Sequence, residues 1–170
     1  MKNQTNAERK SERELVSSRI INGPPRLVFE AWTDPELFKK WWVPKSALMT
    51  LVSCEMDVRT GGTYRLVFSA GGQSAEFFGK YLEVTPPSRL VWTNDEGGVD
   101  AATITTVTFE EVGGATLVSV CDLYPSKEAL DDAIATGSSG AMPEQLEQLE
   151  LLIGAQRNLP TEKSQRAAVS

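Results

Sequence analysis

Apolar and polar residues alternate along most of residues 47–123, and this alternation limits the fold more than any other feature of the chain. A period of two sends successive side chains to opposite faces of a β-sheet. Paired glycines at 61–62, 71–72 and 113–114 interrupt the alternation, and connections this short join antiparallel neighbours. The pattern therefore predicts an antiparallel sheet built from consecutive strands.

Seven strands are expected, one before the alternating region and six within it. Gly79 lies inside one of them, and a residue without a side chain there favours a bend of the sheet. Pro86 and Pro87 cannot donate to the ladder of a central strand, so they predict a turn. The predicted strands are residues 14–21, 47–58, 63–69, 74–84, 89–93, 103–110 and 115–123.

Two short helices are predicted directly after the first strand. Pro25 and Pro35 each suit the first turn of a helix, where the missing N–H costs nothing. Asp34 suits the N-cap of the second helix. We expect this second helix to end by Trp42 or just before Pro44.

A helical pattern returns after the last strand. It begins at Ser126, is interrupted over residues 136–140, and restarts at Pro143. One narrow apolar stripe of the final helix is expected to face the sheet. This stripe consists of Met142, Leu146, Leu149 and Ile153. The residues of the same helix that are expected to face water are Glu144, Glu147, Gln148 and Glu150.

The length of 170 residues and the hydrophobic content of 41% suit one domain with a sizeable core. Residues 1–13 are polar, and residues 158–170 contain too few apolar side chains to pack. We therefore expect a disordered N-terminal segment, a domain over residues 14–157 and a flexible C-terminal tail.

The charge pattern argues against nucleic acid as a partner. The chain carries 17 Lys and Arg against 23 Asp and Glu, a net charge of -6, without a block of like charges. Phosphate binding needs a concentrated basic face. No stretch approaches the roughly 18 consecutive apolar residues of a membrane span, and the N-terminus lacks the apolar core of a signal peptide. We therefore expect a cytoplasmic protein without membrane insertion.

The sequence contains no histidine, which excludes histidine-based triads and removes the commonest metal ligand. Cys54 and Cys121 lack the CxxC spacing of zinc or redox sites, so reduced, buried thiols are expected. The paired glycines form neither a GxGxxG nor a Walker-type loop. No metal or other cofactor is expected.

Residues 28–44 gather three Trp and two Phe in the two short helices and the loop after them. Aromatic side chains of this size either fill a core or line a ligand cavity. Core is the expectation for Trp32. For Trp42, at the end of a short helix beside Pro44, core and cavity wall both stay open.

Five motifs follow one another along residues 14–155: AWTDPE at 31–36, WWVP at 41–44, DVRTGGTYR at 57–65, FGKYLEV at 78–84 and VTFEE at 107–111. In this order they resemble the START-like helix-grip superfamily. Within it, the chain is similar to the bacterial branch related to the activator of the heat-shock-protein-90 ATPase. The resemblance implies an α+β helix-grip fold, with a seven-stranded, curved antiparallel sheet around a long C-terminal helix. Two short helices would follow the first strand, and a cavity would separate sheet and helix.

Face alternation and proximity to the final helix select the residues expected to line this cavity. The sequence does not determine which face of each strand points inward. The expected lining residues are Phe38, Trp42, Met49, Leu51, Tyr64, Leu66, Phe68, Phe78, Trp92, Met142 and Leu146.

Three functions remain open at this stage. The first, which we favour, is the binding of a small apolar or amphipathic ligand in the cavity. The second is regulation of a chaperone ATPase, with a chaperone as partner, as the resemblance implies. The third is catalysis within the cavity, as in some START-like proteins. The side chains in the strands that would suit catalysis are Glu55, Glu76, Tyr81, Glu83 and Asp122, and we expect all five on the solvated outer face.

The sequence identifies neither the ligand nor the oligomeric state. Exposed strand edges are able to pair two copies into a homodimer.

Overall fold

The computed structural model describes residues 5–95, 102–136 and 138–169, and within these residues eight strands form one antiparallel sheet. The order of strands across the sheet is β1-β2-β8-β7-β6-β5-β4-β3. The strands are β1 (Asn6–Arg9), β2 (Glu14–Ile21), β3 (Thr50–Met56), β4 (Thr63–Ala70), β5 (Gln73–Thr85), β6 (Arg89–Asn94), β7 (Thr103–Val112) and β8 (Ala115–Leu123). The predicted α+β class with a curved antiparallel sheet is confirmed.

Strand β1 adds an eighth strand to the predicted seven. It pairs antiparallel with β2, from Asn6 opposite Ser18 to Arg9 opposite Leu15. All four residues of β1 are exposed, so no apolar pattern marks this strand in the sequence. It lies within residues 1–13, for which we expected no regular structure.

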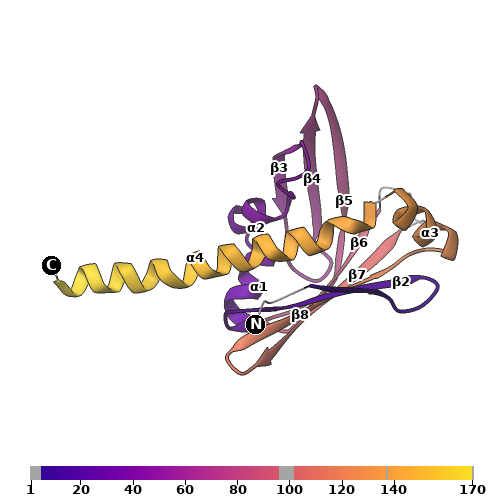
Figure 1. Cartoon of the computed structure of the whole chain (residues 1–170). Helices are drawn as coiled ribbons and strands as arrows, with labels where there is room; N and C mark the ends of the chain where they lie inside the picture. Colours follow the sequence, from indigo (N-terminus) through magenta and orange to yellow (C-terminus); the bar gives the residue numbers. More distant parts are fainter. Residues whose placement is uncertain (1–4, 96–101, 137, 170) are drawn as a thin grey trace.

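The sheet bends sharply at Gly79. Residues of β5 up to Lys80 pair with β4, whereas those from Tyr81 onward pair with β6. A Cβ atom at position 79 would lie only 1.9 Å from the carbonyl oxygen of Thr93. Glycine therefore permits a close approach that any side chain would block. In Figure 1 the part of the sheet formed by β3, β4 and β5 stands steeply against the part formed by β2, β8 and β7.

Two short helices, α1 (Pro25–Thr33) and α2 (Pro35–Trp41), follow β2 as predicted. The Asp34 carboxylate accepts a 2.9 Å hydrogen bond from the backbone N–H of Glu36, which confirms the predicted N-cap. Trp41 is fully buried, and its indole N–H donates to the carbonyl of Ala31 at 2.9 Å. This bond joins the two helices to each other.

Three helical segments end the described chain: α3 (Lys127–Thr136), a 3₁₀ helix (Ser138–Ala141) and α4 (Met142–Val169). The first part of α4 lies across the sheet, and the helix then projects beyond it (Figure 1). Leu146, Leu149 and Ile153 are fully buried, so the predicted stripe faces the core. Residues 158–169, expected as a tail, continue the helix; the domain limits at 14 and 157 stay a prediction.

The polar side of α4 is only partly solvated. Glu147 is exposed, as expected. Glu150 instead forms an ion pair with Arg19 of β2, with 2.6 Å between Glu150 Oε1 and Arg19 Nη2, and the guanidinium group of Arg19 is largely buried. Glu144 and Gln148 also bind protein groups, described below. The expectation that all four residues face water holds for Glu147 and for Glu144, whose hydrogen bonds lie at the surface. It is wrong for Gln148 and Glu150, whose side chains are partly buried against neighbouring segments.

Candidate ligand cavity

A cavity of about 470 Å³ lies between the concave side of the sheet, the α2–β3 connection and the start of α4. Eight of the eleven expected lining residues surround it. They come from α2, the connection after it, the two strands β4 and β6, and α4. These eight are Phe38, Trp42, Met49, Tyr64, Leu66, Phe68, Trp92 and Met142.

Three of the expected lining residues lie elsewhere. Phe78 is 41% exposed, because β5 turns its neighbour Phe77 toward the cavity instead. Leu146 is completely buried in the core, and Leu51 is half-buried against the same core. The structure therefore corrects the expected inward phase at Phe78 and the expected exposure of Leu51 and Leu146 to the cavity.

Aromatic rings form one end of the cavity around Trp32. Its ring centroid lies 4.7 Å from that of Trp41, 6.0 Å from Trp42 and 5.6 Å from Trp92. Phe38 stacks on Trp42 with centroids 4.6 Å apart. Trp32 is buried, as expected for core, but it also lines the cavity, and its indole N–H has no hydrogen-bond partner among the described residues. Trp42 is half-buried and forms part of the wall.

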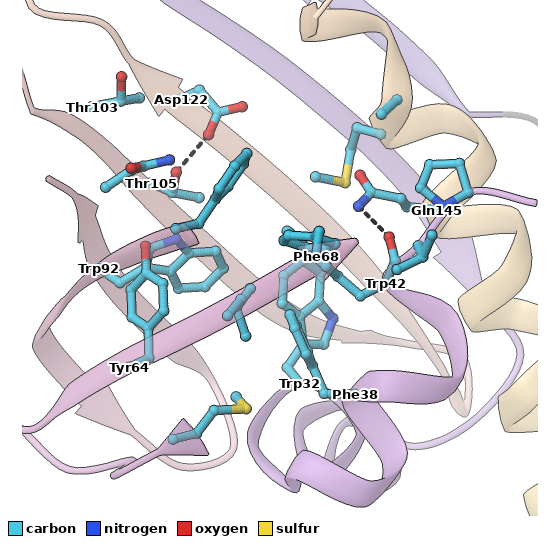
Figure 2. A pocket seen from close by; sticks show the side chains of 18 of the residues that line it. Trp32, Phe38, Trp42, Tyr64, Phe68, Trp92, Thr103, Thr105, Asp122 and Gln145 are labelled. Atoms are coloured by element: carbon cyan, nitrogen blue, oxygen red, sulfur yellow. Dashed lines mark hydrogen bonds between the residues drawn. The ribbon is translucent and has the colours of Figure 1, made fainter. Parts of the chain in front are cut away.

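Side chains of α4 hold the segment that carries Trp42. Gln145 donates to the carbonyl of Trp42 at 2.6 Å. Gln148 donates to the carbonyls of Trp41 and Val43 at 2.8 and 2.9 Å. Figure 2 shows the Gln145 bond beside the aromatic end of the cavity. The helix thus fixes the backbone of the wall rather than only its side chains.

Glu144 extends this attachment one turn earlier on α4. Its carboxylate accepts a 3.0 Å bond from the backbone N–H of Ser46 and another from the Ser46 hydroxyl. These donors hold the pKa of Glu144 below its usual value, because they stabilise the ionised form.

The other end of the cavity is polar. Figure 2 shows Thr103, Thr105 and Asp122 together at that end, on β7 and β8. The Thr105 hydroxyl donates to Asp122 Oδ1 at 2.6 Å. Burial raises the pKa of Asp122, although the Thr105 bond acts in the opposite direction. The expectation that Asp122 faces outward is therefore wrong.

Besides Tyr64, two further tyrosines line the cavity. Burial raises the pKa of Tyr124 to about 12, with a smaller contribution from the charge of Asp122, and burial also raises the pKa of Tyr81. Tyr81, like Asp122, was expected on the outer face, so this expectation is corrected as well. Among the described residues, the hydrogen bond of Asp122 is with Thr105. Asp122 and Tyr81 therefore do not form a hydrogen-bonded acid–base pair.

The remaining catalytic candidates lie outside the cavity. Glu55 and Glu76 are exposed and both pair with Arg65 on the outer face. Glu83 pairs with Arg89 at 3.1 Å. These three carboxylates follow the expectation of a solvated face.

The part of the chain that the structure describes contains no group of three or more His, Cys, Asp or Glu residues placed to hold a metal ion. Cys54 and Cys121 are free and half-buried. None of the helices over the same residues combines the length and apolar content that crossing a bilayer requires.

A curved antiparallel sheet gripping its C-terminal helix defines the class of protein: the START-like (SRPBCC) superfamily. The family model described as "Activator of Hsp90 ATPase homolog 1-like protein" matches residues 22–154, so the chain belongs to this family. The predicted recognition is thereby confirmed.

Solved bacterial structures share the fold. A protein from Nitrosomonas europaea is 25% identical with a TM-score of 0.78, over 88% of this chain and 99% of that one. A protein from Rhodobacter sphaeroides is 22% identical with a TM-score of 0.82, over 89% and 99%. An AHSA1-like protein from Aeromonas hydrophila is 21% identical with a TM-score of 0.66, over 83% and 93%. No curated protein matches the chain.

Proposed function

We propose that the protein binds a small apolar or amphipathic molecule in the cavity between the sheet and α4. The observation that carries the proposal is the cavity itself, whose volume of about 470 Å³ suits a small ligand. Its wall is mostly aromatic and aliphatic, so burial of apolar ligand surface supplies the main driving force.

The arrangement of the wall supports binding over a simple packing defect. Trp32, Phe38 and Trp42 keep fixed positions around the space through mutual ring contacts. The bonds from Gln145 and Gln148 to the backbone of residues 41–43 hold one side of the wall open. A site whose walls are already ordered loses little entropy when a ligand enters.

Titration with N-phenyl-1-naphthylamine, a neutral apolar fluorophore, tests the proposal. We expect saturable binding at one site per chain. Trp42→Ala removes a large part of the wall and should weaken binding about fivefold, about 1 kcal/mol of lost contact. Phe78→Ala is the matched control, because Phe78 is an aromatic residue outside the cavity, and it should leave the affinity within about twofold.

Fluorescence that rises linearly without saturation would contradict ligand binding. Equal weakening by both variants would show that the probe binds elsewhere. Circular dichroism of both variants ensures that folded proteins are compared.

A further inference from the structure

One row of cavity-lining side chains crosses four strands and ends at Asp122, at the polar end of the cavity. Tyr81 of β5 lies opposite Trp92 of β6, Trp92 opposite Thr105 of β7, and Thr105 opposite Asp122 of β8. All four side chains line the cavity. Directly opposite residues share one face of a sheet, so this row presents two aromatic rings, a hydroxyl and a carboxyl group side by side.

Charge is distributed unevenly along the cavity wall. Of the described residues that line it, Asp122 is the one with a carboxylate, and none is Lys or Arg. The ion pairs of the described residues likewise involve carboxylates other than Asp122. An anionic head group would therefore meet a like charge at the polar end and no compensating cation.

Asp122 has acceptor capacity left for a ligand. Its Oδ1 takes the hydrogen bond from Thr105, and an ionised carboxylate has a second oxygen for further donors. Figure 2 shows that this second oxygen points away from Thr105. A largely buried carboxylate is costly to keep ionised unless further donors or a cation stabilise its charge. Burial raises the pKa of Asp122, in agreement with an uncompensated acid.

The neighbouring aromatic rings suit a cation. Trp92 follows Thr105 in the row, and Figure 2 shows Tyr64 beside Trp92 on the same side of the cavity as Asp122. Ammonium groups bind to the faces of Trp and Tyr rings as well as to carboxylates. Phe38, Trp42 and Phe68 form the apolar opposite end.

We propose that the ligand of this cavity is an amphipathic amine, whose protonated nitrogen binds Asp122 while its apolar body lies against the aromatic end. This inference rests on the proposed binding function and specifies the ligand's head group. It assigns Asp122 the role of selecting for amines and against carboxylates.

Three ligands with the same ten-carbon chain test the selection: decylamine, decanol and decanoate. Each displaces N-phenyl-1-naphthylamine at pH 7.5 in 0.15 M salt, at concentrations below micelle formation. We expect decylamine to bind about tenfold more tightly than decanol, because a charge-assisted hydrogen bond is added. Decanoate should bind more weakly than decanol, because its charge repels Asp122.

Asp122→Asn keeps the size of the side chain and an oxygen that accepts from Thr105. In this variant the preference for decylamine over decanol should fall to within about twofold. Asp132→Asn is the matched control, because Asp132 is exposed on α3 outside the cavity. It removes the same charge from the whole molecule and should keep the tenfold preference.

Equal affinities of the three ligands for the wild type, or an amine preference that survives Asp122→Asn, would overturn the amine inference and leave the binding function standing. Absence of saturable binding by the fluorophore and by all three ligands would overturn the binding function as well.

Discussion

At the scale of single residues, Asp122 places a carboxyl group where folding gains little from its charge. Burial raises the pKa of Asp122 in the folded protein above the value of about 3.9 for an unfolded chain. The folded state therefore binds this proton more tightly than the unfolded state does. The stability from this group is fully present below the unfolded pKa and is lost as pH rises through the folded pKa.

Replacement of Asp122 by Asn should consequently stabilise the protein at neutral pH. We expect a higher melting temperature than wild type at pH 7, with a difference that shrinks as pH falls toward 4. Tyr124, which also lines the cavity, has a pKa raised to about 12 and stays neutral over this range. Calorimetry at several pH values measures the difference, with Asp132→Asn as control. A wild type that is more stable than the variant at pH 7 would contradict this interpretation of Asp122.

The alternation along its strand indicates that the side chain of Asp122 points inward, although we expected it to face outward. Thr116, Val118 and Val120 are buried on β8, and Asp122 continues their alternation by one more step. Thr105 has the same relation to Val107 and Phe109 on β7. The usual exposure of charged residues overrode this signal. A charged residue in phase with a buried face is the pattern that identifies such a site.

At the scale of elements, β5 shows why strand positions were predictable and their inward faces were not. Alternation marked the strand correctly, but its register shifts between Tyr81 and Glu83. Val84 packs against the core, whereas Phe78, six positions earlier, is exposed. A bulge reverses the face of all residues beyond it. No residue type in this segment indicates the register shift. The sequence alone therefore predicted Phe78, rather than Phe77, as a cavity-lining residue.

The bend of β5 depends on Gly79, and Gly79→Ala tests this dependence. The new Cβ would meet the backbone carbonyl of Thr93 at 1.9 Å, so one of the two strands must move. We expect a loss of about 3 kcal/mol in the free energy of unfolding. Gly154→Ala is the matched control, because a Cβ there meets nothing within 4 Å, and in a helix it should be neutral or stabilising by up to about 1 kcal/mol. Urea denaturation of both variants gives the comparison, and a neutral Gly79→Ala would exclude the steric explanation.

At the scale of the whole molecule, element order was predictable because periodicity separates strands from helices and because the five motifs resemble one family. The cavity was not predictable from the residues alone. Trp32 and Trp41 lie on the two short helices and Trp42 directly follows the second, yet Trp41 is core while Trp32 and Trp42 line the space. The position of Trp42 in the wall depends on how α4 holds the backbone of residues 41–43 through Gln145 and Gln148. Such long-range bonds leave no local pattern in the sequence.

Helix α4 continues well beyond the part of it that lies on the sheet (Figure 1). The domain limit predicted at residue 157 implies that this projecting part adds little to the stability of the domain. Leu146, Leu149 and Ile153 are its completely buried apolar residues among the side chains that the structure describes. A chain ending at residue 157 keeps all three, so we expect its melting temperature within about 3 °C of the full chain, a change below about 1 kcal/mol. Its affinity for N-phenyl-1-naphthylamine should also be unchanged. By contrast, Leu149→Ala in the full chain should cost about 2–5 kcal/mol, because it opens a cavity where helix and sheet meet. If truncation destabilised the protein as much as Leu149→Ala does, the grip on α4 would extend beyond the stripe, and the domain would have to include the rest of the helix.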